Sequence, residues 1–141
     1  MLYQMIALLL AAEVVLSTGG ELPGPPERTL ALVGDEVQAW GFSEVPPKSR
    51  LQAALALSDA NARAELIKYV KVKVTDSLKA NSTLASEEIE MRTQEVAKGL
   101  LPALPPPQHG WRKLQRGEEV VLQVWSRLTA PAAKLQELVA R

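Results

Sequence analysis

The chain has 141 residues, of which 47 % are hydrophobic and 23 % charged, a composition typical of one soluble globular domain and not of a disordered protein. Its 16 basic and 16 acidic residues cancel, so we expect no nucleic-acid partner. The sequence holds no cysteine, which excludes disulfides, thiolate metal sites, cysteine nucleophiles and an acylated cysteine. We predict neither a cofactor nor a metal site.

An apolar segment opens the chain. Residues 1–16 read MLYQMIALLLAAEVVL, and small residues follow from Ser17 to Gly20. This order is typical of a secretory signal peptide, which we predict at residues 1–19 and which implies export. The segment departs from the usual pattern, because no Lys or Arg precedes the apolar run and Glu13 interrupts it. The alternative is an uncleaved amino-terminal helix that packs on the domain; the run is too short for a membrane-spanning helix.

Glycine and proline then set the domain boundary. They make up most of residues 19–26, where neither a helix nor a strand is expected. We therefore predict a flexible linker over residues 20–28, an α+β domain over residues 29–129 and a carboxyl-terminal helix over residues 130–141.

The domain is predicted to begin with two strands. Short apolar or alternating runs at residues 29–33 and 36–43 flank Gly34-Asp35, a pair that favours a turn. The second strand is the stronger prediction, and it ends before Pro46-Pro47.

A helix is expected next. Residues 49–68 are rich in Ala and Leu at helical spacing, with Asp59 and Arg63 forming an exposed pair one turn apart. In residues 69–76 valine alternates with lysine or threonine, which favours a half-buried strand with the valines inward. The alternative is that the helix continues to Leu78.

The remaining elements follow from caps and turns. The acidic start of residues 86–98 predicts a second helix, and the proline-rich residues 101–107 predict a rigid connector. Residues 110–115 and 118–128 are predicted to pair as a hairpin around Arg-Gly. Alternation along the second strand predicts Val120, Leu122 and Val124 on one face and Val121, Gln123, Trp125 and Arg127 on the other. A last helix is expected from Pro131.

Few side chains point to catalysis. His109 is the only histidine, and we interpret it as an exposed loop residue, because its sequence neighbours supply neither a nucleophile nor an orienting carboxylate. Phosphate-loop, nucleophile-elbow and zinc-protease motifs are all missing from the sequence. We therefore predict a protein that is not an enzyme.

Aromatic side chains are the candidate contact residues. Trp40, Phe42, Trp111 and Trp125 all lie on predicted strands, where at least two of them are expected in the core. We take Trp111 and Trp125 as candidate ligand or partner contacts.

The order of elements over residues 36–128 resembles a family. A Trp-Gly strand, an Ala-rich helix with an Asp-x-x-Ala-Arg-x-x-Leu pattern, a Val-Lys-Val-Thr stretch, a second helix, Trp111 and a strand ending in VWSRL are similar to the bacterial LPP-twenty envelope lipoproteins. The pattern is matched by Asp59, Ala62, Arg63 and Leu66. The family is related to the amino-terminal domain of an outer-membrane flagellar ring protein. This chain lacks the lipid-bearing cysteine of the family.

The resemblance implies a small α+β domain, with a helix packed on an antiparallel sheet, that is exported and held at the envelope without known catalysis. We expect a sheet of about four strands, a periplasmic or outer-membrane-associated location, and an interaction or structural role with an envelope protein partner or in a homo-oligomer. The alternative is a small-molecule-binding domain whose pocket lies between the sheet and its helices, near Trp111 and Trp125.

Overall fold

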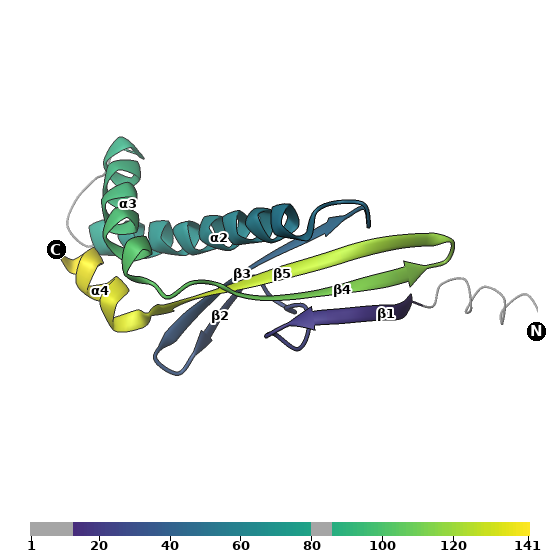
Figure 1. Cartoon of the computed structure of the whole chain (residues 1–141). Helices are drawn as coiled ribbons and strands as arrows, with labels where there is room; N and C mark the ends of the chain where they lie inside the picture. Colours follow the sequence, from purple (N-terminus) through teal and green to yellow (C-terminus); the bar gives the residue numbers. More distant parts are fainter. Residues whose placement is uncertain (1–12, 80–85) are drawn as a thin grey trace, which may run out of the picture.

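A computed structural model of the chain describes residues 13–79 and 86–141 (Figure 1). Its one sheet has five strands in the order β1-β4-β5-β3-β2, with every neighbouring pair antiparallel. The strands are β1 (Glu13–Gly20), β2 (Leu30–Val33), β3 (Glu36–Val45), β4 (Gln108–Arg116) and β5 (Glu119–Pro131). The helices are α2 (Leu51–Lys79), α3 (Ser86–Leu100), the short 3₁₀ helix η1 (Leu101–Ala103) and α4 (Ala132–Ala140). The predicted α+β fold is confirmed, with one strand more than expected.

Helix α2 lies along one face of the sheet (Figure 1). Every fourth residue from Ala54 to Val74 is buried on this face, which gives the helix a narrow buried line of small or apolar side chains that includes Ser58. The helix approaches β3 closely at Gly41, where a Cβ would lie only 1.9 Å from the carbonyl oxygen of Ser58. Glycine at this position therefore allows the backbone of α2 to rest on the sheet.

The strand predicted at residues 69–76 is wrong, because these residues continue α2 as the alternative proposed. Val70 and Val74 lie four residues apart, so they extend the buried line of the helix, whereas Val72 is 54 % exposed. A half-buried strand would have placed all three valines on one face. Val70 and Val74 fit both the strand period of two and the helical spacing of four residues. Packing on the sheet therefore decides which structure forms.

Helices α3 and α4 lie at the carboxyl-terminal end of α2, far from the β4–β5 turn (Figure 1). Arg92 of α3 donates hydrogen bonds to the carbonyl oxygens of Leu138 and Val139, which holds the end of α4. Leu135 and Leu138 belong to the main core. The carboxyl-terminal helix therefore packs into the same core as the rest of the fold. The predicted second helix and hairpin are found as expected, and the predicted proline connector begins with the 3₁₀ helix η1.

The predicted linker at residues 20–28 is only partly correct. Residues 21–28 form no helix or strand, but Gly20 ends β1 and Leu22 is buried, with 5 % of its surface exposed. The backbone amides of Glu21 and Leu22 donate to the carbonyl oxygen of His109 at 2.8 and 3.0 Å. This segment connects strands at opposite edges of the sheet, and those contacts fix its beginning.

Candidate functional site

The structure separates the two candidate tryptophans. Trp111 of β4 is half-buried on the face that α2 covers, where it packs against a cluster that includes Ala54 and Val124. Trp125 follows Val124 on β5, so its side chain points to the opposite face. The sequence pattern of alternating faces in the hairpin is thus correct, but it does not bring the two indoles into one site.

Trp125 is a core residue of the far face, with 2 % of its surface exposed. A Cβ on Gly110 would lie 2.2 Å from the indole nitrogen, and 2.8 Å from the carbonyl oxygen of Leu22. Leu22 and Gly110 therefore close over this ring, while the guanidinium of Arg112 lies 5.9 Å from the ring centroid. Burial of this kind leaves little of Trp125 for a partner to contact.

Trp111 lies instead beside the outer strand of the sheet. Residue Gly19 of β1 pairs with Trp111, and a Cβ on Gly19 would lie 2.5 Å from the indole ring. The ring therefore covers the backbone of β1 at Gly19, where only a glycine fits. Strand β1 continues antiparallel to β4 as far as the pair between Glu13 and Arg116, with one irregularity after Val15.

A row of polar side chains crosses the face of the sheet opposite α2. Arg116 donates to Glu13 at 2.9 Å and to Glu44 at 3.1 Å. Gln123 donates to Glu44 at 3.0 Å and accepts from Arg112 at 2.8 Å. The row therefore links four strands, from β1 at the edge to β3. Residue Arg116, which the sequence suggested only as a turn residue, is the centre of this network.

The network stabilises the ionised form of Glu44. The hydrogen bond from the Gln123 amide, together with the neighbouring Arg116, lowers the pKa of Glu44 below its ordinary value, and burial opposes this shift only in part. Glu44 and Glu13 in turn raise the pKa of Arg116. A carboxylate whose pKa is lower in the folded chain stabilises the fold above its unfolded pKa, and that contribution is lost as the pH falls through the folded pKa.

We therefore expect Glu44→Gln to lower the free energy of unfolding at pH 7 by less than about 1 kcal/mol, because solvent screens a side chain of this exposure. The difference from the wild type is lost in strongly acidic solution, at a pH below the lowered pKa of Glu44 in the folded chain, where the carboxyl group is neutral in both the folded and the unfolded state. Urea unfolding at both pH values measures it. Glu118→Gln, at the exposed β4–β5 turn, is the control and changes little at either pH. An effect of Glu44→Gln that is the same at both pH values would contradict this account.

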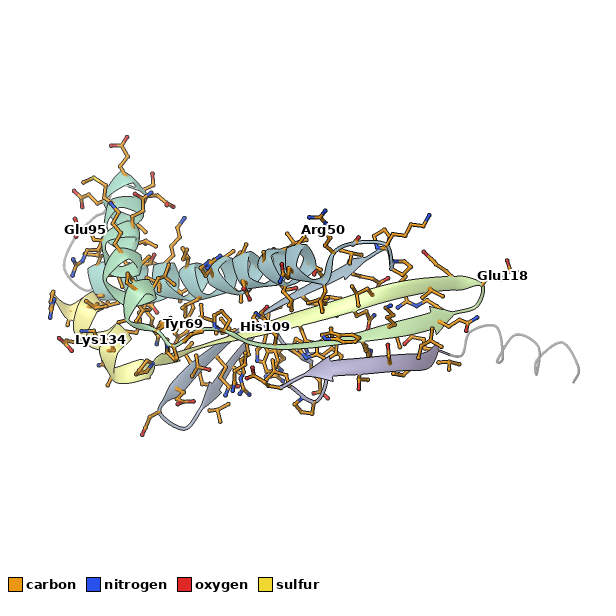
Figure 2. All side chains as sticks on the ribbon, viewed as in Figure 1. Arg50, Tyr69, Glu95, His109, Glu118 and Lys134 are labelled. Carbon is orange, nitrogen blue, oxygen red and sulfur yellow. The ribbon has the colours of Figure 1, made fainter. Side chains whose placement is uncertain are left out.

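His109 is not the exposed loop residue that the sequence suggested. It lies on β4 and is partly buried (Figure 2). Its Nε2 atom is 2.7 Å from Oδ1 of Asp59 on α2. The expected pair between Asp59 and Arg63 is replaced by this contact, which fastens α2 to β4. The two residues are 50 positions apart, so no local pattern could reveal it.

A histidine oriented by a carboxylate is a familiar part of hydrolytic sites, but it also needs an accessible nucleophile. Ser126, which pairs with His109 in the sheet, is fully buried. Ser58 is also fully buried, and its hydroxyl is 2.8 Å from that of Ser43. These serines are therefore part of the interface between helix and sheet. Among the described residues, no group of three or more potential metal ligands gathers.

Both edges of the sheet carry exposed apolar side chains. On β2, Leu32 and Val33 are 65 % and 52 % exposed. On β1, Val14, Val15 and Leu16 are each about half exposed. Neither strand contains a lysine or a proline, which proteins commonly use to protect edge strands.

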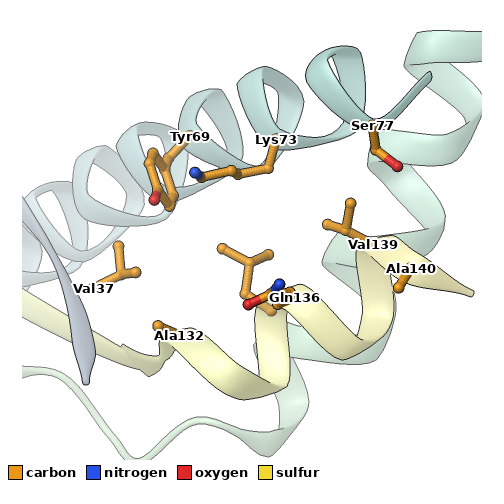
Figure 3. A pocket seen from close by; sticks show the side chains of 9 residues that line it. Val37, Tyr69, Lys73, Ser77, Ala132, Gln136, Val139 and Ala140 are labelled. Atoms are coloured by element: carbon orange, nitrogen blue, oxygen red, sulfur yellow. The ribbon is translucent and has the colours of Figure 1, made fainter. Parts of the chain in front are cut away.

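A pocket of about 360 Å³ lies between α2, α4 and the start of β3 (Figure 3). Its floor is apolar, with Val37 and Leu135, and its rim carries polar groups from α2 and α4. The amine of Lys73 lies 5.4 Å from the ring centroid of Tyr69. Neither candidate tryptophan lines this pocket.

Comparisons with family models, with curated proteins and with solved structures find no match for this chain. The resemblance to the LPP-twenty lipoproteins therefore stays a hypothesis based on the order of elements. Within residues 13–79 and 86–141, no helix is both long and apolar enough to span a membrane.

Proposed function

We propose that the protein is a non-catalytic, exported protein of the bacterial envelope that acts as an interaction or structural module. The observation that carries this proposal is the open sheet edge at β2, where Leu32 and Val33 are exposed, because this edge is present whether or not residues 13–19 are removed. An unprotected apolar edge is a template for pairing with another chain. The proposed partner is an envelope protein, and a second copy of this chain is the alternative.

The proposed export depends on the signal-like sequence of residues 1–19. Residues 1–12 lie outside the described part of the chain, and residues 13–19 belong to β1. The proposed lack of catalysis is supported by the missing sequence motifs and by the burial of Ser58 and Ser126 near the His109–Asp59 contact. The resemblance to envelope lipoproteins agrees with both proposals.

Localisation, intact mass and native size test the proposal together. In cells that make the full chain, we expect the protein in the periplasmic or outer-membrane fraction, shortened near Gly19 or Gly20. Light scattering of the purified native form should give a mass above that of one chain. Leu32→Lys should weaken this association about tenfold or more, because a charge on the edge opposes strand pairing.

Leu57→Lys is the matched control, since Leu57 is also an exposed leucine but lies on α2, away from both edges. It should leave the native mass unchanged. A cytoplasmic chain of unchanged length would contradict the proposed export. An exported chain whose association responds equally to both variants would contradict the edge as the interface.

The pocket between α2 and α4 favours the alternative function, a small-molecule-binding domain. Its volume lies at the small end of the range for ligand sites. An apolar floor with Lys73, Ser77 and Gln136 around it suits a ligand that has an apolar body and an anionic group. A rise in the thermal midpoint with such ligands, abolished by Lys73→Gln, would favour this function over the interaction module.

A further inference from the structure

Strand β1 is attached to the domain mainly through its backbone. Seven of its eight side-chain positions are exposed, and its pairing with β4 is supplemented by the ion pair between Glu13 and Arg116. The next residues behave differently, because Leu22 is buried and its amide is bonded to His109. The chain is therefore held to the domain at Leu22, just after β1. Strand β1 can separate from β4 without disturbing these contacts of Leu22.

The proposed cleavage site falls at this boundary. Cleavage near Gly19 or Gly20 would separate nearly all of β1 from the domain and keep Leu22. The outer edge of β4 would then present unpaired backbone N–H and C=O groups, and Trp111 would lose the glycine backbone that lies under its ring. Such an edge favours the addition of an extended segment.

We propose that cleavage turns β4 into a docking site, where an extended segment of an envelope protein partner replaces β1. This inference rests on the proposed export. The contacts of β1 define the chemistry of this segment. It runs antiparallel to β4, has a glycine where Gly19 meets Trp111, and has an acidic residue where Glu13 meets Arg116.

Charge on β4 agrees with an acidic segment. Arg112, Lys113 and Arg116 lie within this strand, which contains no carboxylate. Arg112 is engaged with Gln123, and Arg116 retains Glu44 when Glu13 leaves, while Glu119 of β5 pairs with Arg116 in register. Lys113 is exposed and has no ion-pair partner among the described residues. The β4 edge therefore keeps the positive charge of Lys113 for a partner, although Arg112 and Arg116 already have partners within the domain.

The test uses the processed protein that cells expressing the full chain release, identified by its intact mass. The probe is a synthetic peptide of residues 13–20, EVVLSTGG, titrated into the labelled protein while the amide signals of β4 are followed by NMR. We expect saturable shifts along β4. A peptide carrying Gly19→Val should bind at least about tenfold more weakly, because its side chain meets the Trp111 ring. The unprocessed full chain should bind neither peptide, since its own β1 occupies the edge.

The outcomes separate this inference from the function on which it rests. An exported, processed chain that binds neither peptide, or that binds both equally well, overturns the docking site and leaves the proposed export intact. A full-length chain that stays in the cytoplasm overturns the proposed export, whereas a chain that is exported but never shortened overturns the open edge alone. Binding of EVVLSTGG to the unprocessed chain also overturns the inference, because a site already filled by β1 must not accept a second copy of that strand.

Discussion

Gly41→Ala should destabilise the protein by about 3 kcal/mol or more, enough to unfold a large fraction of a marginally stable domain. The added Cβ would lie 1.9 Å from the carbonyl oxygen of Ser58 and 2.6 Å from the backbone nitrogen of Ala62. Both atoms belong to the backbone of α2, so no side-chain rotation relieves the clash. The helix must move off the sheet, which opens the core that Leu66 fills.

Gly24→Ala is the matched control for this substitution, because a Cβ at Gly24 meets no atom within 4 Å. We expect it to change the free energy of unfolding by less than about 1 kcal/mol, with a stabilising effect if the unfolded chain loses freedom. Urea unfolding followed by circular dichroism measures both variants. Equal stability of the two variants would show that α2 does not rest on β3 at Gly41.

Trp125→Ala should lower the free energy of unfolding by about 3–5 kcal/mol, because it empties a large, fully enclosed site. Nearly the whole indole is buried beneath Leu22 and beside Gly110. A residue that contributes to folding in this way is unavailable to a partner. The variant should therefore lose stability. Any loss of association should be no larger than the loss of folded protein.

Trp40→Ala is the control, since Trp40 lies on the same face of the sheet but is only partly buried. It loses a contact with Arg127, whose guanidinium lies 5.4 Å from the ring centroid, and should cost less than about 2 kcal/mol. Comparison of the urea midpoints gives the difference. Similar losses for both tryptophans would mean that Trp125 is less enclosed than the structure has it.

Local signals in the sequence predicted most of the fold. Glycine turns predicted both hairpins, and helical spacing predicted the start of α2. The wrong assignment at residues 69–76 arose because valines at Val70 and Val74 satisfy a period of two and a period of four together. Only the packing of α2 decides between them, and its partners include β5 and α4, which follow it in the chain, as well as β3, which precedes it.

The candidate site was harder to predict, because its contacts join distant residues. Strand alternation correctly placed Trp125 and Val124 on opposite faces, yet it could not show that Leu22 covers the indole. The contact between His109 and Asp59 has a separation of 50 residues and leaves no repeating pattern. The close contact of Gly19 with the Trp111 ring could not be predicted either. In the sequence alone, two consecutive glycines indicate only a flexible segment.

The pairing of β1 with β4 also has a consequence for the order in which the chain folds. Gly20 pairs with Gly110, about 90 residues later, so β1 has no partner until most of the protein has been synthesised. At roughly 5–20 residues per second, synthesis of these residues takes roughly 5–18 seconds. During that time β1 is kept out of the sheet by the order of synthesis alone, and under the proposed export this interval leaves the strand accessible before the fold competes for it.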